Sequence, residues 1–236
     1  QCLEEAFGAK SFDYVGDSKA DLSVWPGARN AWVVSGSEKF QEQVASSATV
    51  AKKISAPRSS LKTLVKALRI HQWAKNLLVF VPLIVGHRFG EIETWAHALQ
   101  MFVAFCACAS SVYVLNDILD LESDRSHPTK CKRPFAAGTF ALSNGLLLIP
   151  LLLGLAFVTV WSLGLSSVVT LGLYFAATLL YSTYLKRLAL VDAFVLGGLY
   201  VTRLLAGHMA TEVPLSPWLL AMSGFLFLSL AFVKRY

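Results

Sequence analysis

The chain has 236 residues, of which 55% are hydrophobic and only 15% are charged. Soluble globular domains carry about 25% charged residues, so this composition argues against a chain made of soluble domains alone. A formal net charge of +6 could indicate nucleic-acid binding, but the Lys and Arg residues stand at the ends of apolar runs, which indicates membrane topology and no nucleic-acid partner.

Residues 1–40 have the pattern of a soluble α/β domain. The stretch "CLEEAFGA" predicts a helix, "SFDYVGD" a strand, "ADLSVWPGA" a short helix and "NAWVVSG" a second strand. Asp17 ends the first strand and Asp21 follows four residues later. Acids at the carboxyl end of a strand suit a metal site in an open α/β fold, and the alternative is a plain Asp-containing turn.

The stretch "FDYVGDSKADLSVW" resembles the last acidic motif of the haloacid dehalogenase-like phosphatases. The resemblance implies that residues 1–40 are a C-terminal remnant of such a domain, with a vestigial magnesium site at Asp17 and Asp21. The nucleophilic Asp motif of that family lies upstream and is absent here, so we expect no phosphatase activity.

A linker and a surface helix are predicted next. Residues 41–60, "QEQVASSATVAKKISAPRSS", are small and polar and end in a Pro/Ser cluster, which is typical of a linker. The stretch "LKTLVKALRIHQWAKN" then has apolar residues near helical spacing with bases between them. This pattern predicts a basic amphipathic helix on a membrane surface, so a membrane domain over 61–236 begins here.

Six apolar segments follow, and most are close to the roughly 20 residues that a spanning helix needs. They lie near 77–90, 95–117, 141–161, 164–184, 190–209 and 216–233. Bases gather before the first segment, after the second and fourth, and at the chain end. The sequence therefore predicts an all-α polytopic membrane protein, in a bacterial inner or plasma membrane, with its N-terminus and basic loops in the cytoplasm.

The second apolar segment ends in the acidic stretch "NDILDLESD". On a helix Asp117, Asp120 and Asp124 share one face, and Asn116 stands one turn below Asp120. Three like charges on one face are plausible where a divalent cation neutralises them, and oxygen ligands of this kind suit magnesium, which often shares its shell with substrate phosphates. The alternative is a solvated helix end that marks the membrane exit.

Basic and polar residues near the acids could bind phosphate. Arg125, Lys130 and Arg133 follow within ten positions of Asp124, although positive-inside topology would also explain them. Other residues at segment ends or inside segments are weaker candidates for substrate binding. These are Lys75, Tyr181, Lys186, Asp192 and Arg203. For Lys75 the alternative is a lysine that anchors the segment by extending its charge to the membrane surface.

The acidic stretch matches the NDxxDxxxD signature of the UbiA superfamily of intramembrane prenyltransferases. The stretch "YSTYLKR" resembles a second recurrent element of that family. "HQWAKNLLVFVPL", "NDILDLESDRSHPTKCKRPFAAG" and "VDAFVLGGLYVTRLLAG" most resemble its decaprenyl-phosphate phosphoribosyltransferase branch. The family fold has nine transmembrane helices and a second acidic motif near the end of the sixth. We therefore expect a fragment with six helices that lacks the second motif and is of uncertain activity.

The resemblance implies a magnesium-dependent transferase. In the phosphoribosyl branch, the donor is phosphoribosyl pyrophosphate and the acceptor is a polyprenyl phosphate, with magnesium on Asp117, Asp120 and Asp124 holding the leaving pyrophosphate. In the general family, the same site ionises a prenyl diphosphate and an aromatic acceptor captures the cation. A transporter is the rival class, but it should carry midplane charges more than a cluster of acids at the boundary.

Overall fold

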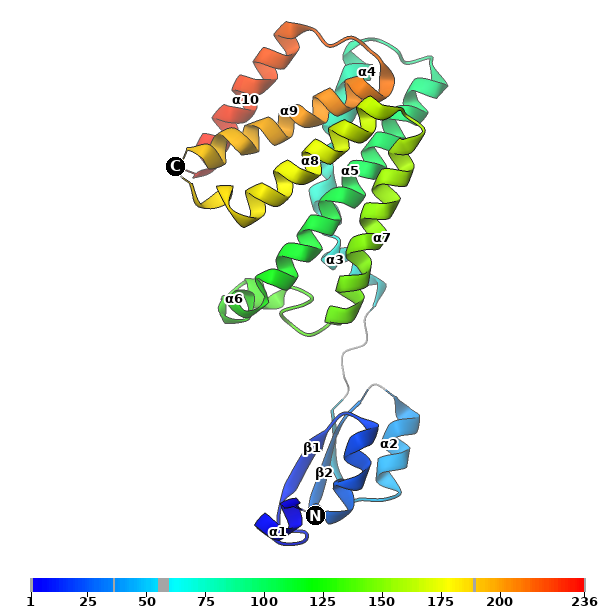
Figure 1. Cartoon of the computed structure of the whole chain (residues 1–236), viewed down its shortest axis with the longest axis vertical. Helices are drawn as coiled ribbons and strands as arrows, with labels where there is room; N and C mark the ends of the chain where they lie inside the picture. Colours follow the sequence, from blue (N-terminus) through cyan, green and yellow to red (C-terminus); the bar gives the residue numbers. More distant parts are fainter. Residues whose placement is uncertain (1, 36, 55–59, 189, 236) are drawn as a thin grey trace. The chain divides into compact units, whose positions relative to one another are not determined.

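A computed structural model describes residues 2–35, 37–54, 60–188 and 190–235. The chain divides into two compact units, Gln1–Ser60 and Leu61–Tyr236 (Figure 1). The boundary between them coincides with the predicted start of the membrane domain. Each unit is described by itself.

The first unit is a small parallel sheet with short helices. Its elements are α1 (Cys2–Phe7), β1 (Asp13–Gly16), η1 (Lys19–Ser23), η2 (Trp25–Gly27), β2 (Asn30–Val34), α2 (Glu38–Ala45) and β3 (Val50–Ile54). The strand order is β1-β2-β3, and both neighbouring pairs are parallel. Trp25, Ala31, Val33 and Val44 form the buried core.

The linker predicted over 41–60 is wrong for most of its described length. The end of α2 and the whole of β3 lie there, and β3 pairs in parallel with β2. Two β-branched residues, Val50 and Ile54, bracket the strand, and Val50 packs against the core of the unit. The polar residues around this short strand hid it, because a linker and an edge strand share that composition.

The second unit is helical throughout. Its elements are α3 (Leu61–Ala67), η3 (Ile70–Phe80), α4 (Val81–Val85), α5 (Ile92–Leu119), α6 (Leu121–Ser126), η4 (Lys130–Lys132), α7 (Leu142–Trp161), α8 (Leu165–Thr183), η5 (Leu185–Arg187), α9 (Val191–Thr211) and α10 (Pro217–Arg235). Within the described residues, four helices (α5, α7, α8 and α9) are long and apolar enough to cross a membrane. The apolar helices Ile70–Val85 and Pro217–Val233 are shorter.

Helix α5 is the centre of this unit. It packs against α7, α8, α9 and η3, while α10 packs against α9 (Figure 1). Two thirds (67%) of its most apolar window is buried, compared with 17% for α7 and for α8. Its middle is rich in Ala, Cys and Ser, and small side chains let neighbouring helices approach closely. The exposed faces of α7 and α8 are apolar, as lipid contact requires.

The single surface helix predicted over 61–76 is wrong, because the chain turns in its middle. Helix α3 ends at Ala67, and Arg69 has a left-handed backbone with a φ of 50°. Ser110 of α5 stabilises this break, since its hydroxyl donates to the Leu68 carbonyl (2.9 Å) and accepts from Trp73 Nε1 (3.0 Å). Beyond the break the chain continues as the 3₁₀ helix η3, packed against α5 and α9.

Candidate functional site

The acidic stretch does not form one continuous helix. Helix α5 ends at Leu119, Asp120 has a non-helical ψ of 8°, and α6 begins at Leu121. Asp117 and Asp124 are buried, with 2% and 1% of their surfaces exposed, whereas Asp120 is partly exposed. The predicted row of three acids on one helical face is therefore interrupted at its middle member.

Two arginines bind the buried acids. Arg69 Nη2 lies 2.5 Å from Asp117 Oδ1, and Arg133 Nη1 lies 3.2 Å from the same oxygen. Arg133 Nη1 also lies 2.6 Å from Asp124 Oδ2, so this one guanidinium bridges both acids. Buried carboxylates are costly unless they are paired, and these pairs come from the left-handed turn before η3 and from the loop after η4.

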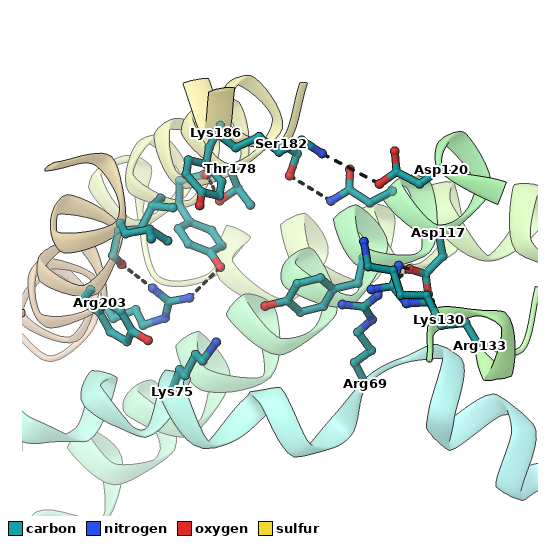
Figure 2. A pocket seen from close by; sticks show the side chains of 17 residues that line it. Arg69, Lys75, Asp117, Asp120, Lys130, Arg133, Thr178, Ser182, Lys186 and Arg203 are labelled. Carbon is teal, nitrogen blue, oxygen red and sulfur yellow. Dashed lines mark hydrogen bonds and ion pairs between the residues drawn. The ribbon is translucent and has the colours of Figure 1, made fainter. Parts of the chain in front are cut away.

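Asp117 and Asp120 line a cavity of about 310 Å³ (Figure 2). Basic residues dominate its wall: Arg69, Lys75, Lys130, Arg133, Lys186 and Arg203. These six bases and two acids give the described wall a formal charge of +4. The remaining lining residues are polar or apolar: Tyr113, Asn116, Tyr174, Thr178, Tyr181, Ser182, Leu196, Leu199 and Tyr200. Such a wall attracts an anion, since opposite charges in a partly desolvated cavity interact strongly.

The charged side chains fall into two groups in Figure 2. Arg69, Lys130 and Arg133 surround Asp117 on one side of the view, and Arg203 and Lys75 lie on the other. Lys186 lies near Asp120, with 3.8 Å between its Nζ and Oδ2. Among the described residues that line the cavity, Asp117 therefore lies away from Lys75 and Arg203 in this view.

Most of the predicted site residues meet at this cavity. Lys75, Asn116, Asp117, Asp120, Lys130, Arg133, Tyr181, Lys186 and Arg203 all line it. Three predicted residues of the second unit do not line it. Asp124 is buried beside Arg133, Arg125 is exposed on α6 away from the cavity wall, and buried Asp192 accepts a hydrogen bond from Tyr181 Oη at 2.6 Å.

The sequence interpretation missed Arg69 and Ser182. Arg69 was assigned to a surface helix, although a base directly before a membrane entry could have suggested a role at the site. Ser182 Oγ accepts a hydrogen bond from Asn116 Nδ2 at 2.9 Å, which joins α5 to α8. The stretch "YSTYLKR" contains Tyr181, Ser182 and Lys186, so the motif was found even though the role of its serine was not.

The magnesium site predicted at Asp117, Asp120 and Asp124 stays a prediction. In the part of the chain that the structure describes, no group of three or more His, Cys, Asp or Glu residues could hold a metal ion. The donor set still fits magnesium, which is commonly bound by one or two carboxylates and substrate phosphates. Asp117 and Asp120 supply two carboxylates on the cavity wall, and buried Asp124 Oδ1 has no hydrogen-bond partner in the structure.

The acids of the first unit form a turn. The Asp21 carboxylate accepts hydrogen bonds from the backbone amides of Asp17 and Ser18, at 3.0 and 2.9 Å, and from Tyr14 Oη at 3.0 Å. The Ser18 amide, together with these other donors, holds the pKa of Asp21 below its usual value. These contacts give Asp21 a structural role in the loop after β1, while its vestigial metal role with Asp17 stays a prediction.

Residues 78–236 match the sequence profile of the UbiA prenyltransferase family. This chain belongs to the UbiA prenyltransferase family. Members are integral membrane proteins, in agreement with the four long apolar helices. The match begins at residue 78, so the phosphatase likeness of residues 1–40 gains no support from it and stays a prediction.

Two curated relatives show how far the similarity extends. The chain is 37% identical over 237 residues to the uncharacterized protein y4nM of Sinorhizobium fredii, covering 100% of this chain and 46% of that protein. It is 37% identical over 184 residues to a decaprenyl-phosphate phosphoribosyltransferase of Mycolicibacterium smegmatis, covering 76% of this chain and 58% of that protein. The chain thus spans about half the length of these two relatives.

A solved structure shares the fold. A UbiA homolog from Archaeoglobus fulgidus, bound to DMAPP and Mg²⁺, aligns with a TM-score of 0.60 at 18% identity. The alignment covers 71% of this chain and 61% of that one. The predicted UbiA-like helical arrangement is confirmed at the level of the fold.

Proposed function

We propose that the protein containing this chain is a magnesium-dependent intramembrane transferase that moves a phosphoribosyl group from phosphoribosyl pyrophosphate to a polyprenyl phosphate. The observation that carries the proposal is the cavity beside the acidic motif, with six basic and two acidic lining residues. Both proposed substrates carry phosphate groups, so such a wall would suit them together. The similarity to a named decaprenyl-phosphate phosphoribosyltransferase supports the same choice.

The acids and arginines would divide the binding of the donor. Asp117 and Asp120, with Asp124 as a third candidate, would hold magnesium, which when bound neutralises charge on the leaving diphosphate. Arg69, Arg133 and Lys130 would bind phosphate oxygens. In the structure, the two arginines pair with Asp117, and a guanidinium fork can exchange a carboxylate for a phosphate without losing its bidentate geometry.

The transfer itself would be a displacement at the anomeric carbon of the ribose. An oxygen of the lipid phosphate forms a bond to this carbon, the bond to the diphosphate oxygen breaks, and diphosphate leaves with the electron pair. The chain's own residues orient the two phosphorylated groups and keep them from repelling each other. Positioning and electrostatic stabilisation of this kind supply much of the rate enhancement in phosphate chemistry.

A prenyl transfer is the second candidate. The fold neighbour from A. fulgidus binds DMAPP and Mg²⁺, and the same acids could hold a prenyl diphosphate while an aromatic acceptor captures the allylic cation. The cavity wall favours the phosphoribosyl version, because a neutral aromatic acceptor would not need the bases Lys75 and Arg203. A transporter is disfavoured, since the acids of the NDxxDxxxD motif gather where α5 ends and α6 begins instead of lining a path.

The orientation of the protein stays part of the proposal. The bases at the ends of the apolar helices predict that the acidic motif and the cavity mouth face the cytoplasm, where phosphoribosyl pyrophosphate would be available. The named relatives come from bacteria, which supports a location in the bacterial inner or plasma membrane.

A transfer assay with the intact protein in detergent tests the proposal. Labelled phosphoribosyl pyrophosphate, polyprenyl phosphate and magnesium should give labelled lipid, and removal of magnesium with EDTA should abolish the product. A parallel reaction with labelled prenyl diphosphate and a phenolic acceptor should give none. The reverse result, with prenyl transfer and no phosphoribosyl transfer, would establish the second candidate instead.

A further inference from the structure

Helix α3 has a buried face that fixes its place on the helical unit. Ala67 is fully buried and belongs to one apolar cluster with Val114 of α5 and with Phe135 and Phe140 of the loop after η4. Leu64, one turn earlier in the helix, packs against the same cluster. This face therefore joins α3 to the last two turns of α5.

The outer side of α3 carries an apolar stripe beside a basic stripe. Leu61 and Val65 lie four residues apart on one side of the helix, with 78% and 41% of their surfaces exposed. Lys62 and Lys66, each one position further along the chain, form the second stripe and are exposed as well. With 3.6 residues per turn, the basic stripe lies opposite the buried face and the apolar stripe lies between the two.

The position of α3 is that of a helix at a membrane boundary. Its buried face contacts α5 close to Leu119, where this long apolar helix ends and the acidic stretch continues. The same cluster takes in Leu148 and Ile149, which lie in about the second turn of α7. Both α5 and α7 are long and apolar enough to cross a membrane. A helix packed at their ends lies at the level where hydrocarbon gives way to lipid headgroups.

The chemistry of the two stripes matches that of a lipid surface. Exposed Leu61 and Val65 can enter the acyl-chain region, and the long stems of Lys62 and Lys66 let their ammonium groups reach the headgroups. Among the residues that the structure describes, no ion pair includes either lysine. Their charge is therefore complementary to an anionic headgroup, and a lysine near an anionic surface strengthens binding by about fivefold.

We propose that α3 is an interfacial helix that binds the headgroups of anionic phospholipids through Lys62 and Lys66, with Leu61 and Val65 inserted among the acyl chains. Of the surface helix predicted over 61–76, only this first part then lies on the membrane. The inference goes beyond the proposed function, because it concerns the bilayer and not the substrates. Neither lysine lines the cavity.

The turn after α3 links this surface to the cavity. Helix α3 ends at Ala67, and Arg69, two residues later, has a left-handed backbone and pairs with buried Asp117. A residue other than glycine keeps such a backbone only where its surroundings hold it. Lipid binding by α3 therefore stabilises one side of the turn, while Ser110 of α5 binds the Leu68 carbonyl within it.

Hydrogen exchange of the α3 amides, measured by mass spectrometry on the intact protein in nanodiscs, tests the proposal. Two bilayers are compared, phosphatidylcholine alone and an equal mixture of phosphatidylcholine and phosphatidylglycerol. In the wild type, exchange in α3 and in the turn after it should be about fivefold slower or more in the anionic bilayer, because the lysines bind its headgroups. In the double variant Lys62→Gln/Lys66→Gln, the rates in the two bilayers should be equal.

A second double variant tests the apolar stripe. Leu61→Ser/Val65→Ser should speed the exchange of the α3 amides in both bilayers, because contact with acyl chains does not depend on the charge of the headgroups. Unchanged exchange in this variant would contradict the insertion of these two side chains.

A matched control separates the effect of α3 from a general effect of charge. Lys19→Gln/Lys39→Gln removes the same charge from two exposed positions of the first unit, and it should keep the difference between the two bilayers. Peptides from the buried middle of α5, residues 104–112, should exchange alike in all variants. Faster exchange there would reveal a variant that has lost its fold.

Two results would overturn the proposal. One is equal exchange of the wild-type α3 amides in the two bilayers, and the other is a difference that persists in Lys62→Gln/Lys66→Gln. Slow exchange that neither lipid charge nor either α3 variant changes would mean that a protein segment covers this face instead of lipid. Transfer activity is not measured, so the outcome is independent of whether the proposed function is confirmed.

Discussion

The two ends of helix α5 carry polar hollows of similar size and opposite character. The cavity at its last turn has a volume of about 310 Å³ and is lined by six bases and two acids. The hollow at its first turns has a volume of about 390 Å³, and its charged lining residues are acids, Glu93 and Glu212, beside His97. Volume alone therefore does not distinguish the two hollows, whereas the sign and number of their lining charges favour the cavity at the last turn as the proposed substrate site.

The ion pairs at the two ends differ in the same way. Arg88 and Glu91, near the first turn of α5, are three residues apart and exposed, with 52% and 45% of their side chains accessible. Arg69 and Asp117 come from separate elements, and Asp117 is only 2% exposed. Exposed pairs stabilise proteins by about 1 kcal/mol or less, while a buried acid depends on its partner. Only the second pair requires the fold to bring distant residues together.

Among the variants that test this difference between the two ends, Asp117→Asn should cause the largest loss of transfer activity. The substitution keeps the size of the side chain but removes the charge that Arg69 and Arg133 share, and it removes a proposed magnesium ligand. Transfer activity should fall about a hundredfold or more. Glu122→Gln is the matched control, since this exposed acid lies on α6 within the same stretch. Equal activity in the two variants would contradict a role for buried Asp117 in the transfer reaction.

Arg69→Lys tests the geometry of the cavity end, with Arg88→Lys as its counterpart at the other end. A lysine keeps the charge but loses the planar fork that can bind a carboxylate or phosphate at two points. The apparent affinity for the phosphorylated donor should fall about tenfold in Arg69→Lys and stay unchanged in Arg88→Lys. Steady-state KM values for the donor measure this difference, and similar values in the two variants would contradict it.

Gly207→Ala should weaken the wall that carries Lys75. The new Cβ would meet the Val79 carbonyl carbon at 3.0 Å and Pro82 Cδ at 3.1 Å, so η3 must move away from α9. The free energy of unfolding should fall by about 1–3 kcal/mol. Gly198→Ala, in the same helix, has no atom within 4 Å of its new Cβ and should change this free energy by about 0.5 kcal/mol or less. Chemical unfolding in detergent compares the two.

Glu93→Gln should have the smallest effect. Glu93 lines the hollow at the first turns of α5, where we propose no substrate binding. Transfer rates and donor affinity should stay within about twofold of the wild type, which corresponds to less than half a kcal/mol. A large loss in this variant would mean that the two ends of α5 are functionally coupled.

The acidic stretch shows what sequence patterns can predict. The helix period correctly placed Asn116 and Asp117 at the end of an apolar helix, and the bases that followed included Arg133. The period did not predict that the helix would end at Leu119. Arg133 contacts both Asp117 and Asp124 across this break, and local spacing carries no information about such a tertiary ion pair.

The segment before the first apolar run shows what sequence patterns do not predict. Its bases and apolar residues fit a surface helix by spacing, yet Arg69 adopts a left-handed backbone and η3 follows with three residues per turn. No single residue in "LRIHQWAKN" signals this winding. Its tertiary contacts are made by Ser110, Arg203 and Gly207 of other helices, and local sequence spacing does not show such contacts.

The winding of η3 also changes how far this segment reaches. A 3₁₀ helix rises about 2.0 Å per residue and an α-helix about 1.5 Å, so the 11 residues of η3 extend about 22 Å and the five of α4 about 7.5 Å. Together they approach the roughly 30 Å thickness of a bilayer's hydrocarbon core, a length for which an α-helix needs about 20 residues. The number of residues therefore underestimates the length of Ile70–Val85, because the larger rise per residue of the 3₁₀ helix compensates for the smaller number of residues.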